Sequence, residues 1–185
     1  MITKYKNSPN TEIEFRLGRR SGNKFDTNVG KESFAKCFGS LDLYSGWELK
    51  KHEKFEVYYF EGGKRLQINE VTDERDAVVK KRILVNDFIL EGHPFDVRLG
   101  MATEMPFEYD GETATEQKTK ERWSFVRKNL SIDLSRITGT PDDPDDDEDT
   151  SYQIELEIID PSKLQGDDLF KILYKVFDVM KCITS

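Results

Sequence analysis

The chain has 185 residues, of which 36% are hydrophobic and 35% are charged, and its formal net charge is −8. This length fits one domain with a sizeable core, and the charged fraction is high for such a domain. Two cysteines far apart and two histidines exclude a disulfide framework, a Cys-rich zinc site and a His-based catalytic centre. We find no signal peptide and no apolar run long enough to span a membrane, so a soluble intracellular protein without a membrane partner is expected.

Most of the net charge lies in one segment. Residues 142–149 read DDPDDDED and carry seven acidic residues without a Lys or Arg. Acidic runs of this kind are usually solvated, so we expect a mobile acidic loop over 141–150. Without these seven charges the remainder is near −1, and it carries many charges of both signs.

The dominant period along the chain is two, which indicates β-strands. In chain order we expect a strand over Glu12–Leu17, a short helix over Lys31–Phe38, strands over Trp47–Phe60, Arg65–Glu70, Ala77–Leu84, Phe95–Met105, Lys118–Lys128, Leu130–Thr138 and Tyr152–Ile159, and a helix over Ser162–Cys182. Glu61–Lys64 and Asn129 predict turns, and Ser162 predicts a helix N-cap. About eight or nine strands with few helices indicate a barrel or a sandwich.

Several predicted strands carry like charges at alternate positions. The glutamates are Glu12 and Glu14 in one strand, with Arg16 on the same face, and Glu155 and Glu157 in another; the cations are Lys80 with Arg82 and Lys120 with Arg122. Half-buried strands commonly turn such residues to solvent. Carboxylates two residues apart repel each other, however, unless a cation lies between them. Carboxylate pairs and cation pairs on facing strands favour a site that holds a metal ion together with a polyanion.

This residue set fits phosphoryl transfer assisted by a hard metal ion. Mg²⁺ and Mn²⁺ prefer oxygen ligands, and Mg²⁺ commonly uses a few carboxylates plus substrate phosphates. Lys and Arg bind phosphate oxygens, and a carboxylate that is not bound to metal can orient the attacking water. Such a reaction depends on positioning and charge neutralisation more than on covalent chemistry.

The motifs that carry these residues resemble those of a known family. EIEFRLG and YQIELEI, at Glu12–Gly18 and Tyr152–Ile158, resemble the first and last glutamate motifs of the metal-dependent RNA triphosphatases of fungal and large-DNA-virus capping systems, the triphosphate tunnel family. The other strands of the family are matched in the same order by KRLQI at Lys64–Ile68, KKRI at Lys80–Ile83, FDVRLGMATE at Phe95–Glu104, KERWSF at Lys120–Phe125 and SIDLSRI at Ser131–Ile137. The resemblance covers the chain from about Thr11 to the C-terminus.

The resemblance implies a role for each matched residue. The metal ligands are Glu12, Glu14, Glu155 and Glu157. Glu104 would position the attacking water. The residues expected to bind the phosphates are Arg65, Lys80, Arg82, Arg98, Lys120 and Arg122, and Asp133 and Ser135 are carried over as site residues. Ser131 stands where the family usually has an arginine, and Gln153 where a third acidic residue is common.

The fold expected from the resemblance is mainly β: a closed, antiparallel, eight-stranded barrel, the triphosphate tunnel, with a charged interior and helices packed outside. It implies a single tunnel domain over residues 1–185, with the barrel over 11–160, and an N-terminal position in a larger capping enzyme. The implied reaction is hydrolysis of the γ-phosphate of 5′-triphosphate RNA with Mn²⁺ or Mg²⁺, and of nucleoside triphosphates as well. A monomer, a fused or bound guanylyltransferase, and a place in the cytoplasm or virion of a large DNA virus or in a fungal nucleus are expected.

Two alternatives keep the barrel and change its function. One is a tunnel enzyme for thiamine triphosphate, tripolyphosphate or an adenylate-cyclase reaction. That relative usually has Lys where this chain has Arg16, which weighs against it. The other is a barrel that binds polyphosphate without catalysis.

Overall fold

The computed structural model describes residues 7–139, 150–166 and 168–184, without the side chain of Leu169. The acidic loop expected over 141–150 lies outside these residues, except for Thr150, which begins the last strand. In the part of the chain that is described, no helix has the length and apolar character needed to cross a membrane.

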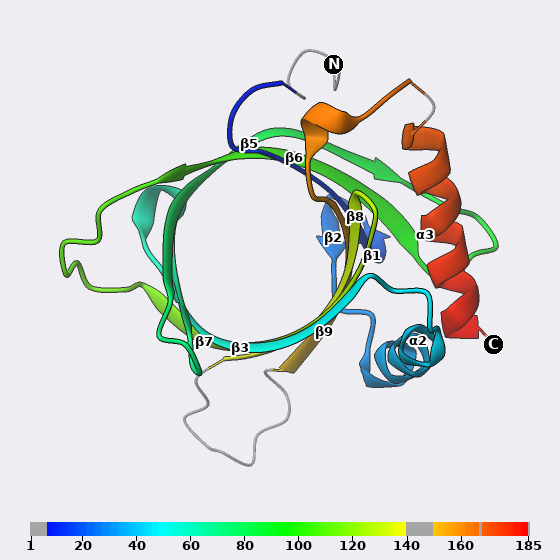
Figure 1. Ribbon diagram of the computed structural model, residues 1–185, viewed down its shortest axis with the longest axis horizontal. Helices are drawn as coiled ribbons and strands as arrows, with labels where there is room; N and C mark the ends of the chain where they lie inside the picture. Colours follow the sequence, from blue (N-terminus) through cyan, green and yellow to red (C-terminus); the bar gives the residue numbers. More distant parts are fainter. Residues whose placement is uncertain (1–6, 140–149, 167, 185) are drawn as a thin grey trace.

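Eight antiparallel strands close into a barrel (Figure 1). The strands are β1 (Thr11–Ser21), β3 (Leu49–Tyr59), β4 (Lys64–Asn69), β5 (Arg75–Phe88), β6 (Asp96–Pro106), β7 (Glu116–Arg127), β8 (Leu130–Gly139) and β9 (Thr150–Ile158). They follow the order β1-β6-β5-β4-β3-β7-β8-β9, and the pairing of β9 with β1 closes the ring. The mainly β, closed eight-stranded barrel expected above is therefore confirmed.

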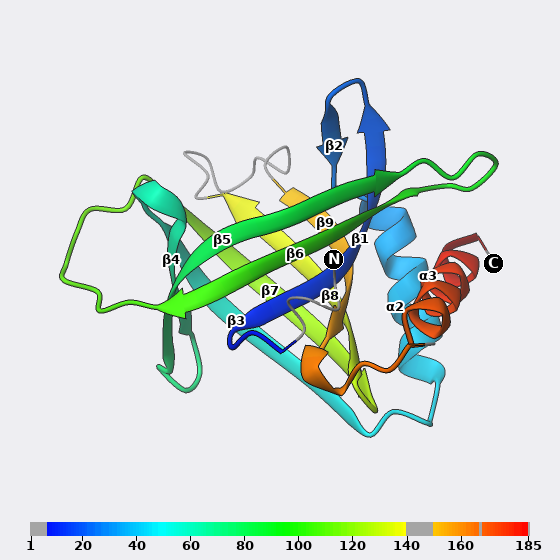
Figure 2. The same ribbon diagram turned by 90° about the horizontal axis from the view of Figure 1, so that it is seen from above.

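A ninth strand, β2 (Lys24–Asp26), pairs only with the end of β1. Figure 2 shows this hairpin projecting beyond one end of the barrel. The hairpin needs a glycine at Gly18 in β1, because an added Cβ there would lie 2.2 Å from the carbonyl oxygen of Asp26. The alternation of the first strand did not predict β2.

The hydrophobic core lies outside the barrel wall, between the strands and two helices. Ile13, Phe15 and Leu17 point outward from β1 and are almost fully buried. They pack in one cluster with residues of α2 (Lys31–Leu43) and α3 (Asp168–Thr184), which lie on the same side of the barrel in Figure 1. Burial of one such side chain contributes about 1.5–3 kcal/mol, so the outer face supplies the stability that a charged interior cannot.

The C-terminal helix begins later than the sequence predicts. Ser162 does not cap it; the expected start forms a short 3₁₀ turn, η3 (Pro161–Lys163), whose Ser162 amide donates to the Asp160 side chain. Helix α3 starts only at Asp168, whose carboxylate accepts from the amide of Gln165. Asp160 therefore caps the start of the 3₁₀ turn, and the chain leaves the helical conformation at Leu164, whose φ and ψ are −63° and 127°.

The two predicted turns are present with details that sequence alone did not give. The chain between β3 and β4 forms a 3₁₀ turn, η1 (Glu61–Gly63), in which Gly62 and Gly63 have φ of 72° and 78°. Between β7 and β8 the residue with positive φ is Lys128, at 55°, and not Asn129. Asn129 instead exchanges two hydrogen bonds of 2.8 Å with the backbone of Asp160.

Candidate active site

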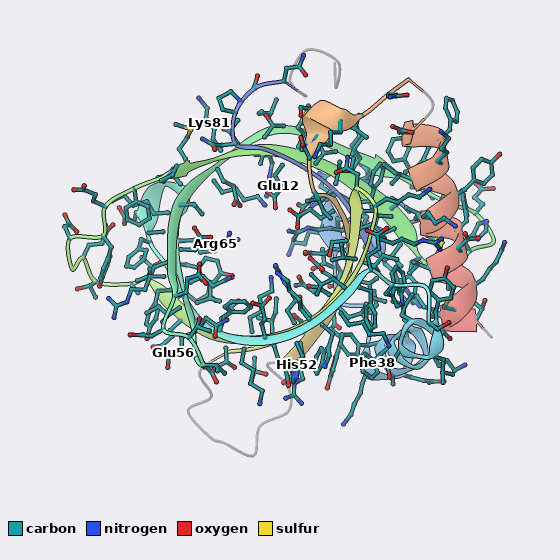
Figure 3. All side chains as sticks on the ribbon, in the orientation of Figure 1. Glu12, Phe38, His52, Glu56, Arg65 and Lys81 are labelled. Atoms are coloured by element: carbon teal, nitrogen blue, oxygen red, sulfur yellow. The ribbon has the colours of Figure 1, made fainter. Side chains whose placement is uncertain are left out.

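Strand pairing sets which charged residues face the inside of the barrel. Glu14 is paired with Glu157 of β9 and with Gly100 of β6, and Arg16 is paired with Glu155. Residues opposite each other in neighbouring strands share a face, so the glutamates of the first and last strands point the same way. Figure 3 shows Glu12 and Arg65 pointing into the barrel, whereas Lys81 and His52 point away from it.

Arg16 joins the glutamates of β1 and β9. Its Nε and Nη2 donate to the two carboxylate oxygens of Glu14, at 2.9 and 3.0 Å, and Nη2 lies 3.1 Å from Oε1 of Glu155. Burial would raise the pKa of Glu155, but Arg16, then Lys120 and Arg122, outweigh it and lower this pKa to about 2. The pKa of Glu14 is raised, first by burial and then by the charge of Glu155.

A second group of ion pairs lies beside the first. Lys80 of β5 forms an ion pair with Glu12 and lies 3.9 Å from Oε1 of Glu14. Its Nζ is also 3.5 Å from Oε1 of Glu104, the residue expected to position water. Arg65 of β4 donates to the same Glu104 oxygen at 3.3 Å. Together with β9, the strands β1, β4, β5 and β6 thus contribute to one continuous charged surface.

Glu157 is the carboxylate of this surface that most needs a further cation. Burial, followed by the charges of Glu12 and Asp133, raises its pKa to about 7, even though Arg122 acts in the opposite direction. A divalent ion near Glu157 would relieve that repulsion, and its hard-acid preference fits an all-oxygen set. Among the described residues, no three carboxylates already surround one metal position, and Glu12, Glu14 and Glu155 are instead paired with Arg16 or Lys80.

The cations of β7 lie three strands from β1 around the ring, beyond β9 and β8. Arg122 Nη1 is 3.9 Å from Oδ2 of Asp133, whose other oxygen accepts a 2.6 Å hydrogen bond from Ser131. The charged side chains that act on Lys120 are mostly cations. Burial, then Arg122, lowers its pKa to about 7, although Glu155 acts to raise it. A bound polyanion would restore the charge of Lys120.

Three buried hydrogen-bond donors of the inner face have no partner among the described residues. They are Nε of Arg65, Nε of Arg122 and the hydroxyl of Ser135. Ser135 is opposite Arg122 in the β7–β8 ladder and is fully buried. Leaving a buried donor unpaired costs about 1–3 kcal/mol, so a ligand rich in acceptor oxygens would stabilise this wall.

Two of the predicted phosphate ligands are placed less centrally. Arg82 is paired with Ala102 on the inner face, but its side chain is exposed and makes no ion pair with the described residues. Arg98 is also on the inner face, opposite Arg16, and forms two hydrogen bonds with Asp87, at 2.7 and 3.0 Å. Its guanidinium lies over the ring of Phe25, 4.4 Å from the centroid. It therefore reaches the site already neutralised, which the motif did not predict.

Sequence reasoning missed two residues that shape the site. Arg16 shares the polar face of the first strand, and its alternation with Glu12 and Glu14 was a signal that it also points inward. Gly100 carried no signal. A Cβ at Gly100 would lie 3.1 Å from Oε1 of Glu14, so this glycine provides the room that the glutamate occupies.

Comparisons with known proteins agree with this geometry. A sequence model of the family "mRNA capping enzyme, beta chain" matches residues 50–171. The mRNA-capping enzyme subunit beta of Yarrowia lipolytica is 26% identical over 119 residues, which is 64% of this chain. The match spans 28% of the length of that curated relative.

Solved structures show the same barrel. The RNA triphosphatase Pct1 of S. pombe superposes with a TM-score of 0.79 at 18% identity, over 98% of this chain and 88% of that one. The Mimivirus capping enzyme triphosphatase superposes with a TM-score of 0.63 at 16% identity, over 96% and 92%. At these identities the structures establish the fold, and the family match extends over most of the chain. The chain therefore belongs to the family of the mRNA capping enzyme beta chain.

Proposed function

We propose that this domain hydrolyses the γ-phosphate of 5′-triphosphate RNA and leaves a 5′-diphosphate end. The observation that carries the proposal is the set of buried, unpartnered donors of Arg65, Arg122 and Ser135 on the inner wall that also holds the glutamates. Phosphate oxygens would satisfy these donors, and a metal ion would satisfy the glutamates. RNA as the substrate is supported by membership of the capping family.

The metal ligands in this proposal are Glu12, Glu14, Glu155 and Glu157, with Mn²⁺ or Mg²⁺ as the ion. Their oxygen-only donor set and the raised pKa of Glu157 fit a hard divalent cation. When bound, such an ion would neutralise charge on the γ-phosphate oxygens and polarise them, which favours attack of water on the γ-phosphorus.

The side chains of the chain supply positioning and electrostatics. Arg65, Lys120 and Arg122 would bind the phosphate oxygens, and Lys80 and Arg82 would add positive charge around them. Arg98 would have to exchange its ion pair with Asp87 for a phosphate before it could contribute. Ser135 would donate its free hydroxyl, while Asp133 holds Arg122 in place. Glu104, steadied by Arg65 and Lys80, would accept a hydrogen bond from the attacking water and align it with the γ-phosphorus. No covalent intermediate with the protein is involved.

The proposal is tested by phosphate release from γ-labelled triphosphate RNA, ATP and tripolyphosphate, each with Mn²⁺, with Mg²⁺ and with EDTA. We expect metal-dependent release from RNA and ATP, and a loss of about 10²–10³-fold in Glu104→Gln, similar to loss of one oriented transition-state contact. Lys81→Gln is the matched control, because Lys81 points outward from β5. Release from tripolyphosphate alone would replace this proposal with the tripolyphosphatase alternative, and no release from any substrate would refute catalysis.

The family also bears on partners. We propose that the domain acts beside a guanylyltransferase, either fused or bound, which would cap the diphosphate end. Co-purification of a guanylyltransferase activity with the full-length protein would test this. Its absence at stoichiometric amounts would contradict it.

A further inference from the structure

A cation of β3 faces the interior without a role in the site described so far. Lys50, its neighbour, points outward: its Nζ contacts the backbone and side-chain oxygens of Asp42, at 2.6 and 2.8 Å, and lies over the ring of Phe125. Because successive side chains of a strand alternate between faces, Lys51 points inward. It is paired with Ser124, which is itself paired with Asp133.

Lys51 differs from most inner cations in having no carboxylate partner. Arg16, Lys80 and Arg98 each form an ion pair that a new anion would have to share or break. Lys51 is exposed, and among the described residues its side chain forms no hydrogen bond or ion pair. Glu53, which shares the inner face two residues later, is not within ion-pair distance. An incoming phosphate would therefore meet Lys51 without displacing another anion.

Lys51 lies near one of the two open ends of the barrel, so it distinguishes the two ends. The start of β3, at Leu49, lies at the same end as the β7–β8 turn, since Leu49 is paired with Val126. We call this end, with Leu49, Lys51 and the turn at Lys128 and Asn129, the Lys51 mouth. The opposite end is marked by Gly139 of β8, which is paired with Lys118 of β7, and by Thr150 of β9, which is paired with Thr138.

Distance along the sheet separates Lys51 from the glutamates. Two strand spacings, about 10 Å in all, lie between Lys51 and Asp133, and a further strand leads to Glu155. Lys51, Ser124, Asp133 and Glu155 occupy one row of paired positions across β3, β7, β8 and β9, so Lys51 faces the same part of the interior as Glu155. The side chains of Ser124 and Ser131, which lie on the inner face between Lys51 and the glutamates, are small.

We propose that the RNA chain leaves the barrel through the Lys51 mouth, and that Lys51 Nζ binds a phosphate of the RNA adjoining the triphosphate. This assignment rests on the proposed function, and it goes beyond it by naming the exit side and a specificity-determining residue for RNA over free triphosphates. Lys51 acts on RNA binding and not on the reacting γ-phosphate.

The test compares Lys51→Ala with Lys54→Ala, a change on the same strand but the outer face, where Lys54 pairs with Glu121. KM and kcat are measured for triphosphate RNA of ten nucleotides and for tripolyphosphate. We expect Lys51→Ala to raise KM for the RNA about fivefold, equivalent to one exposed phosphate contact of about 1 kcal/mol, with kcat and the tripolyphosphate KM unchanged. Lys51→Arg should restore most of the affinity, whereas Lys54→Ala should behave as wild type.

Binding measured without turnover keeps this inference separate from the proposed function. Fluorescence anisotropy with 3′-labelled triphosphate RNA in EDTA should show a salt dependence of log K that is shallower by about 0.7 in Lys51→Ala, as expected for loss of one single-strand phosphate contact. An unchanged RNA affinity and salt slope would overturn the inference. So would an equal rise in the KM for tripolyphosphate, which would place Lys51 on the triphosphate itself. Absence of hydrolysis together with the expected binding change would refute only the proposed reaction.

Discussion

Replacing Arg16 with Met should strip two buried carboxylates of their shared cation. Arg16 contacts Glu14 twice and Glu155 once, within 3.1 Å, and methionine keeps much of the side-chain length without the charge. Removing one partner of a buried ion pair costs about 3–5 kcal/mol. Because the Arg16 side chain is 28% exposed, we expect the lower end, about 3 kcal/mol. That corresponds to a fall in Tm of about 6–12 °C in a domain of this size.

The pH at which the domain loses stability in acid should also change when Arg16 is replaced. In the wild type the pKa of Glu155 is lowered to about 2, below its ordinary value of 4.5. Its contribution is thus present above pH 4.5 and is lost as the pH falls towards 2. Without Arg16 this pKa rises, so Arg16→Met should lose the contribution at a higher pH than the wild type.

Urea denaturation at several pH values measures both effects. Lys36→Met is the matched control, since its pair with Glu32 is exposed at 3.8 Å and should change stability by less than about 0.5 kcal/mol. The double variant Arg16→Met/Glu14→Gln should recover part of the loss, because one uncompensated charge is removed. A cost below about 1 kcal/mol for Arg16→Met, with no change in the pH at which stability is lost in acid, would refute a buried charge network held by this arginine.

Three further predictions concern the inner face. Gly100→Ala should lower kcat about tenfold with little change in Tm, because its Cβ would displace the Glu14 carboxylate from 3.1 Å; an unchanged kcat would contradict the close approach. Lys120→Met should raise Tm while activity falls, since burial and neighbouring cations lower the pKa of Lys120 to about 7 and make its charge costly in the free protein; a lower Tm would contradict this. Mn²⁺ affinity, measured by calorimetry, should fall below pH 7 with proton release on binding, because the pKa of Glu157 is raised to about 7; Glu157→Gln should remove the proton release, and its persistence there would exclude Glu157 as the source.

The alternation of residue types along the chain predicts most of the fold and part of the site. The period of two and the paired charges predicted the strands and, with the family resemblance, the closed barrel. They also placed Glu12, Glu14, Glu155 and Glu157 on inner faces. These features are local, because alternation within one strand decides which residues share a side.

Features that depend on contacts between distant strands were not predictable in the same way. Arg16 binds Glu155 only because β9 closes onto β1, and Arg98 is neutralised only because β5 brings Asp87 beside it. The room at Gly100 depends on the side chain of a neighbouring strand. The 3₁₀ turn that precedes α3 is capped by Asp160, which Asn129 holds from the turn before β8. Strand register and loop contacts decide such details, and neither can be predicted from the periodicity of the sequence.

Locating a metal ion and a triphosphate together in the barrel tests the account most directly. Anomalous X-ray scattering from crystals containing Mn²⁺ and tripolyphosphate gives the position of the ion and of the phosphates. We predict Mn²⁺ in direct contact with glutamates of both β1 and β9, and phosphate oxygens on Arg65, Arg122 and Ser135. Mn²⁺ bound outside the barrel, or a tripolyphosphate that leaves those three donors unpaired, would contradict the account.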